Sequence, residues 1–126
     1  MKTRRCFVSN SSTSSFIIGS KEPVTLEMLE KLLGIEENKL STTFLKEIAA
    51  TIWERMNEEP WKSVEAYKAE KGHEPGKEIK NLIDGGYLVY EGRFGDDEHD
   101  TAECFLCYQE IDFTSDEFVM KKDAAY

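Results

Sequence analysis

The sequence has no apolar run that approaches the length of about 20 residues that a bilayer-spanning helix needs. Its longest purely apolar stretches, such as Tyr87 to Tyr90, have the length of a β-strand. The basic residues near the N-terminus are followed by short apolar pieces that a serine run interrupts, a pattern unlike the apolar core of a signal peptide. We therefore expect a soluble protein located in the cytoplasm.

Cysteine and histidine are also scarce, with three and two residues in a chain of 126. An odd number of cysteines in a chain of this length does not suit a small disulfide scaffold, so we expect reduced thiols. His73 and His99 fall in separate predicted loops, and no serine lies in a Gly-x-Ser-x-Gly motif. Nucleophilic catalysis requires a nucleophile, a base and an orienting group in contact. The sequence therefore predicts a protein without enzymatic activity and without a cofactor.

Basic residues are outnumbered by acidic ones, 16 to 25, and the net charge of −9 is unevenly distributed. Residues 1–21 contain four basic residues and no acidic one. Between Glu91 and Glu117, ten acidic residues are opposed only by Arg93. Such a surface repels phosphate backbones, so direct nucleic-acid binding is not expected and a basic protein partner is favoured.

The middle of the chain has the apolar periodicity of helices. The pattern predicts helices over residues 26–33, 42–56, 61–71 and 79–84. Thr25 is a suitable N-cap for the first, and Gly34 and Gly72 are suitable stop signals for the first and third. The second helix has the most regular apolar stripe, formed by Phe44, Leu45, Ile48, Ala49, Ile52, Trp53 and Met56. We expect Trp53 and Trp61 to lie in the core or in helix packing.

Both ends of the chain favour β-structure. Residues 5–8 and 16–19 are short apolar segments on either side of a polar loop, residues 9–15. Further strands are predicted over residues 87–94, 102–113 and 118–120, with the acidic segment 95–101 as the hairpin loop between the first two.

These elements predict an α+β fold, with a mainly antiparallel sheet of N-terminal and C-terminal strands packed on a central set of helices. We expect the helices to cover one face of the sheet. Residues 1–126 are predicted to form a single domain. It consists of a basic, serine-rich β arm (1–22), a helical region (23–84), an acidic β hairpin or meander (85–121) and a tail (122–126).

The serine-rich segment is distinctive in the order of its residues, which read RRCFVSNSSTSSFII over positions 4–18. This resembles the opening of a group of small, uncharacterised bacterial and phage proteins. They begin with one or two basic residues, followed by Phe-Val-Ser-Asn, a run of serines, and Phe with β-branched residues after it. The chain departs from that pattern at Cys6, where those proteins often have glycine, and at Thr13. The resemblance implies a bacterial or phage origin and supplies no catalytic residues.

The same segment is a candidate anion or small-ligand site, because hydroxyl and guanidinium groups beside backbone N–H groups suit a bound anion. The alternative is a polar segment whose serines bond locally to the backbone. The candidate residues are Arg4, Arg5, Ser9, Asn10, Ser11 and Ser12.

A zinc site is the second candidate. Cys104 and Cys107 form a single CxxC, which Cys6, His73 or His99 could complete. We expect both cysteines inside a strand, pointing to opposite faces, so two buried thiols are favoured over metal binding or redox chemistry.

The acidic segment is a candidate surface for binding a partner through Asp96, Asp97, Glu98 and Asp100. Carboxylates could also gather Ca²⁺ or Mg²⁺ there, but the segment lacks the residue order of an EF-hand, and a solvated hairpin tip is favoured. The leading hypothesis is a non-enzymatic protein-interaction module of bacterial or phage origin with an acidic binding face. One form of it is mimicry of DNA towards a nucleic-acid-binding protein. Anion binding and zinc binding are the alternatives.

Overall fold

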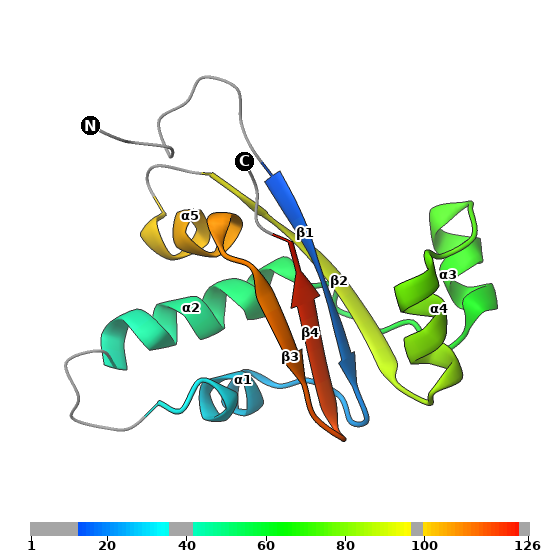
Figure 1. Ribbon diagram of the computed structural model, residues 1–126, viewed down its shortest axis with the longest axis horizontal. Helices are drawn as coiled ribbons and strands as arrows, with labels where there is room; N and C mark the ends of the chain where they lie inside the picture. Colours follow the sequence, from blue (N-terminus) through cyan, green and yellow to red (C-terminus); the bar gives the residue numbers. More distant parts are fainter. Residues whose placement is uncertain (1–12, 36–41, 97–99, 124–126) are drawn as a thin grey trace.

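The computed structural model describes residues 13–35, 42–96 and 100–123 of the chain. Within these residues it contains five helices and a four-stranded antiparallel sheet with the strand order β2-β1-β4-β3 (Figure 1). In chain order the elements are β1 (Thr13–Ser20), α1 (Leu26–Leu32), α2 (Thr42–Arg55), α3 (Val64–Lys71), α4 (Lys77–Asp84), β2 (Leu88–Gly95), α5 (Thr101–Tyr108), β3 (Ile111–Thr114) and β4 (Phe118–Lys122). The predicted α+β class is confirmed. None of these helices is long and apolar enough to cross a bilayer.

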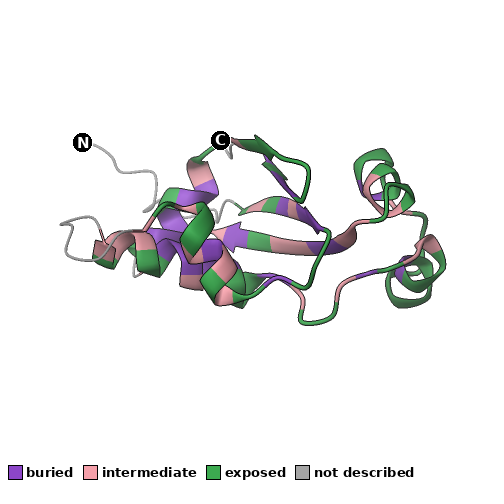
Figure 2. Ribbon diagram, turned by 90° about the horizontal axis from the view of Figure 1, so that it is seen from below, coloured by how far each residue is buried: buried purple, intermediate pink, exposed green. Residues whose placement is uncertain are grey.

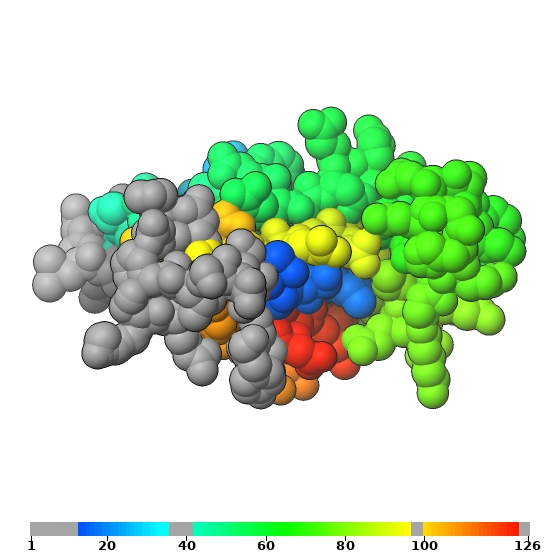
Figure 3. Space-filling model, turned by 90° about the horizontal axis from the view of Figure 1, so that it is seen from above, coloured from blue at the N-terminus to red at the C-terminus, as the bar shows by residue number. Residues whose placement is uncertain are grey.

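Strand β1 lies inside the sheet and joins the two ends of the chain. Ile18 pairs with Tyr90 of β2 on one side and with Met120 of β4 on the other. Seen from above, β1 lies between β2 and β4 (Figure 3). The predicted pairing of the N-terminal strand with the C-terminal strands is therefore confirmed. β1 begins at Thr13, so residues 13–15 belong to a strand and not to the predicted loop, because their backbone pairs with the end of β2.

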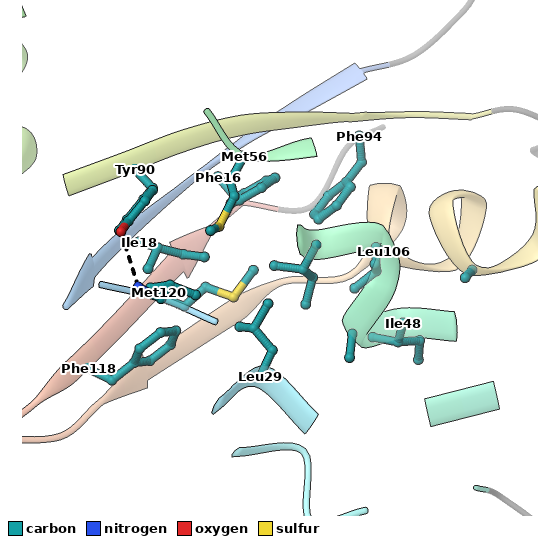
Figure 4. Packing of buried hydrophobic residues seen from close by; sticks show 14 of the residues in the cluster. Phe16, Ile18, Leu29, Ile48, Met56, Tyr90, Phe94, Leu106, Phe118 and Met120 are labelled. Carbon is teal, nitrogen blue, oxygen red and sulfur yellow. Dashed lines mark hydrogen bonds between the residues drawn. The ribbon is translucent and has the colours of Figure 1, made fainter. Parts of the chain in front are cut away.

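The main core fills the face of the sheet that α1, α2 and α5 cover (Figures 1 and 4). Alternate residues of a strand face opposite sides, so Phe16 and Ile18 both point into this core, where they are fully buried. The ring of Phe16 stacks on that of Phe94, with centroids 4.5 Å apart. The helices contribute Leu29, Ile48, Ala49, Ile52, Ala102, Leu106 and Cys107.

A smaller apolar cluster lies on the opposite face of the sheet. Trp61, Tyr67, Ile79 and Val89 are buried there, and Ile17 packs against them. The prediction that helices cover only one face was therefore wrong, since α3 and α4 cover part of the second. The reason is visible in β1, where Ile17 places an apolar side chain on the face opposite Phe16 and Ile18. Most of the outer surface of α3 and α4 is exposed (Figure 2).

Trp61 precedes α3 instead of starting it. Its N–H donates to the carbonyl of Val89 at 2.9 Å, and its carbonyl accepts from the N–H of Val89 at 3.1 Å. This bridge to β2 holds Trp61 in extended form, so the helix starts later, with Ser63 as N-cap accepting from the N–H of Ala66. The predicted end of the helix is confirmed at Gly72, which has the left-handed φ of 80°.

The predicted strand over residues 102–113 was also wrong. Residues 101–108 form helix α5, and only Ile111–Thr114 are extended. The carboxylate of Asp100 accepts from the N–H of Glu103 and starts the helix, an N-cap signal that the aromatic and apolar run after it obscured. The hairpin predicted around residues 95–101 is consequently a strand-to-helix connection.

Trp53 lies at the surface and not in the core. We predicted it in the core stripe of the second helix, but its side chain is 41% exposed. The buried face of α2 is narrower than the predicted apolar stripe, and its buried residues are Ile48, Ala49, Thr51 and Ile52.

Candidate functional site

The candidate anion site falls outside the described residues, since all six of its residues, Arg4, Arg5, Ser9, Asn10, Ser11 and Ser12, belong to residues 1–12. Cys6, Asp97, Glu98 and His99 also lie outside them. Of the predicted site residues, the structure therefore describes His73, Asp96, Asp100, Cys104 and Cys107. His73 is exposed and its ring packs against that of Tyr67, with centroids 5.6 Å apart.

Asp96 and Asp100 both serve the fold. Asp96 is 8% exposed and accepts a hydrogen bond from the hydroxyl of Tyr108 at 3.2 Å. Asp100 is the N-cap of α5, with 3.0 Å between its Oδ1 and the nitrogen of Glu103. These two carboxylates are directed towards α5 and do not form a solvated hairpin tip.

Cys104 and Cys107 both lie on α5 and are buried, one turn apart, so they do not point to opposite faces as predicted. Cys104 is disulfide-bonded, so the prediction of reduced thiols is wrong for this side chain. The cysteine argument for a reducing compartment therefore loses its support. Among the residues that the structure describes, no group of three or more His, Cys, Asp or Glu side chains is placed to hold a metal ion.

The C-terminal end of α5 is tied to β1 and β4 by polar groups. The carbonyl of Cys107 accepts from Ser14 Oγ at 2.9 Å and from Lys122 Nζ at 3.1 Å. Lys122 is 4% exposed, and burial lowers the pKa of its ammonium group. Burial likewise raises the pKa of the Cys107 thiol. Nζ also donates to the carbonyl of Asp123, so the bonds of this cluster tie elements of the fold together.

A largely apolar opening lies elsewhere, in a groove between α1, α2, α5 and the β3–β4 hairpin. Its volume is about 440 Å³, within the range of about 300 to 1,000 Å³ that is usual for ligand pockets. We call it the apolar groove and define it by its lining residues: Leu29, Leu32, Leu33, Phe44, Leu45, Ile48, Ile52, Phe105, Leu106, Gln109, Glu110, Ile111, Phe113, Phe118 and Met120.

Three side chains on the rim of the apolar groove are largely uncovered. Leu32 is 42% exposed, and Phe105 and Phe113 are each 44% exposed. The rings of Phe105 and Phe44 pack in a T-shaped arrangement, with centroids 5.7 Å apart, and Phe105 stays largely exposed despite this contact. Of the large apolar side chains that are exposed within the described ranges, only Trp53 lies outside the groove. Exposed apolar side chains that lie together are typical of interaction surfaces, whereas single exposed apolar side chains scattered over a surface are not.

Acidic side chains lie next to the apolar groove. Glu110 lines it, and Asp112, Asp116 and Glu117 are exposed on β3 and the turn that follows. None of the four forms an ion pair with any residue in the described part of the chain. Their charges therefore remain available to a basic partner.

The apolar groove is not visible in the sequence because its rim comes from three separate parts of the chain. Phe105 and Phe113 were assigned to one strand, where both would lie on the same strand face and appear as core residues. On α5, however, Phe105 lies at the edge of the buried face that contains Ala102, Leu106 and Cys107, and it remains exposed. The signal that could have revealed this was the spacing of Ala102 and Leu106, four residues apart as on one face of a helix.

The apolar groove is suited to burying apolar groups of a partner. Its lining is apolar apart from Gln109 and Glu110, and no nucleophile paired with a base is present among its lining residues. Desolvation of apolar side chains, together with attraction to the neighbouring acids, is what this surface offers a partner. No protein-family model, no curated protein and no solved structure matches this chain.

Proposed function

We propose that this chain is a non-enzymatic protein-interaction module of bacterial or phage origin, and that it binds its partner through the apolar groove and the acids beside it. The observation that carries the proposal is the convergence of Leu32, Phe105 and Phe113 on one opening. A cytoplasmic location and a basic partner remain part of this proposal.

In this proposal the acidic binding face consists of other residues than those predicted from the sequence. Asp96 is buried against Tyr108, and Asp100 holds the first turn of α5, so neither is free to serve a partner. Glu110 and Asp112 are exposed and lie beside apolar side chains. A partner at the groove would therefore gain apolar burial and charge attraction at the same surface.

A polypeptide suits the apolar groove better than a small apolar molecule does. Small-molecule sites are clefts or cavities that bury most of their ligand. Here the rim residues Phe105 and Phe113 are each 44% exposed, so the opening continues as a surface. Apolar and aromatic anchors at the centre of such a surface, with charges at its edge, are typical of protein-binding sites.

The experiment is a selection of short random peptides on the purified full-length chain, followed by measurement of the dissociation constant of each enriched peptide. We expect the triple variant Leu32→Ser, Phe105→Ser, Phe113→Ser to lose at least about tenfold in affinity, since each lost anchor removes apolar burial. The matched control is Trp53→Ser, which alters an equally exposed apolar residue outside the groove and should bind like the unmodified chain.

Two results would overturn the proposal. One is that no peptide is enriched over an unrelated protein of similar charge. The other is that enriched peptides bind the triple variant as tightly as the unmodified chain, with circular dichroism showing that the variant is folded.

A further inference from the structure

The two edges of the sheet differ in what lies beyond them. β2, at one edge, forms bridges on its outer side, between Gly92 and Met56 and between Val89 and Trp61. β3, at the other edge, pairs only with β4 within the described ranges. The outer backbone N–H and C=O groups of β3 are therefore available for pairing with a further strand.

β3 is protected as an edge strand only by its short length of four residues and by one charge. Its residues, Ile111–Thr114, include no proline and no lysine, and Phe113 is 44% exposed. Ile111 and Phe113 line the apolar groove, whereas Asp112 lies on the opposite face of the strand. Asp112 is thus the one charged side chain that guards this edge.

The charges around β3 determine which strand could occupy the edge. Glu110, Asp112, Asp116 and Glu117 are exposed without ion pairs to the described residues, even though Lys121 stands opposite Asp112 on β4. A second copy of this chain pairing through the same edge would bring these acids against their own counterparts, which is unfavourable. A strand with lysine or arginine would instead be attracted to them.

We propose that the partner contributes an extended segment that adds to the outer edge of β3 as a fifth strand, with basic side chains alternating with apolar ones. The alternation places the apolar side chains on the groove side, next to Phe105 and Phe113, and the basic side chains on the opposite face, next to Asp112. This inference rests on the proposed function and specifies the form and charge of the segment that the groove receives.

The decisive experiment uses two N-methylated versions of an enriched peptide. In an added strand, alternate N–H groups point to β3 and the others point to solvent. Methylating the set that points to β3 should weaken binding at least about tenfold, whereas methylating the other set should leave the affinity nearly unchanged. A helical peptide uses all of its N–H groups internally, so both methylated versions would lose binding.

The charge component is tested on the protein side. The double variant Glu110→Lys, Asp112→Lys should bind the enriched peptide about tenfold more weakly, and added salt should weaken binding to the unmodified chain. The matched control is Glu65→Lys, Glu70→Lys, which reverses two exposed acids on α3 and should bind normally. Amide hydrogen exchange of the complex should show new protection in β3.

The outcomes separate this inference from the proposed function. If both methylated peptides bind, or neither does, while the triple variant Leu32→Ser, Phe105→Ser, Phe113→Ser still loses affinity for the unmethylated peptide, the groove remains the site and the added strand is wrong. Enriched peptides without basic residues would overturn the charge component. A dimer in solution that the Glu110→Lys, Asp112→Lys variant dissociates would assign the edge to a second copy and overturn the inference. Failure to enrich any peptide overturns both proposals.

Discussion

Arg55 and Glu103 join the last turn of α2 to the first turn of α5 through an ion pair with 2.6 Å between Nη2 and Oε1. The second carboxylate oxygen, Oε2, accepts from the N–H of Gly95 at 2.6 Å. Glu103 is buried, whereas the Arg55 side chain is 46% exposed. One buried carboxylate therefore holds α2, β2 and α5 together, and with them the helices that form the apolar groove.

Replacing Glu103 should destabilise the fold more than replacing Arg55. Glu103→Ala leaves the Gly95 N–H without its acceptor and is expected to cost about 2 kcal/mol of unfolding free energy, measured by urea denaturation. Arg55→Ala should cost about 1 kcal/mol, because solvent screens the half-exposed guanidinium. Glu103→Gln, which retains an acceptor oxygen, is the control and should fall between these values. An Arg55→Ala variant as unstable as Glu103→Ala would contradict this order.

Gly92 should not tolerate a side chain. A Cβ at this position would overlap the Phe16 ring and the carbonyl oxygen of Arg55, at the point where the end of α2 crosses β2. We expect Gly92→Ala to reduce the unfolding free energy by about 3 kcal/mol. Gly76→Ala is the control, since a Cβ there would meet no atom of a non-adjacent residue within 4 Å and the φ of Gly76 is −66°. Equal stability of the two variants would show that the crossing relaxes without cost.

The hydroxyl of Tyr90 should contribute more to the unfolding free energy than that of Tyr87. Tyr90 Oη accepts from the N–H of Val24 at 3.1 Å in the buried core (Figure 4). Tyr90→Phe leaves that N–H buried without a partner, at an expected cost of about 2 kcal/mol. Tyr87 donates to the carbonyl of Asp116 at an exposed site, so Tyr87→Phe should cost less than about 0.5 kcal/mol. Thermal unfolding of both variants measures the difference.

Cys107 should make stability fall at alkaline pH. Burial raises the pKa of its thiol above the ordinary value of 9.0, although the hydrogen bond from Ser14 and the charge of Lys122 oppose the shift. The folded state therefore favours the protonated thiol, and this contribution is complete below pH 9.0 and lost as the pH rises through the folded pKa. The unfolding free energy of the unmodified chain relative to Cys107→Ala should be constant near neutral pH and decrease above pH 9.0.

A second buried group, Lys122, also affects how the unfolding free energy depends on pH. Burial lowers the pKa of its ammonium group, so its own contribution rises with pH, opposite in sign to that of Cys107. Both the unmodified chain and Cys107→Ala retain Lys122, and the comparison largely removes its effect. A difference that stays flat above pH 9.0 would show that the thiol is not stabilised in its protonated form.

Local signals in the sequence were sufficient for much of the fold. Thr25 accepts from the N–H of Met28 as an N-cap should, and Gly72 ends α3 in the left-handed conformation. The periodicity over residues 42–56 and the change of period after Gly86 located α2 and β2. These features depend on residues within one or two turns of each other, so a single sequence contains them. The pairing of β1 with the C-terminal strands also followed from apolar segments at both ends of the chain.

The tertiary structure decided the elements whose bonds come from distant residues. The helical form of α5, despite its strand-like run, is held by the buried Glu103, which pairs with Arg55 and accepts a hydrogen bond from Gly95. Trp61 is extended because its backbone pairs with that of Val89. The apolar groove exists only where α1, α5 and β3 meet, and the exposure of Phe105 and Phe113 depends on which neighbours fail to cover them. The order of residues therefore determined which segments are apolar and where helices begin and end. Packing determined which apolar surfaces were left for a partner, because burial depends on all neighbours in space and not on those in sequence.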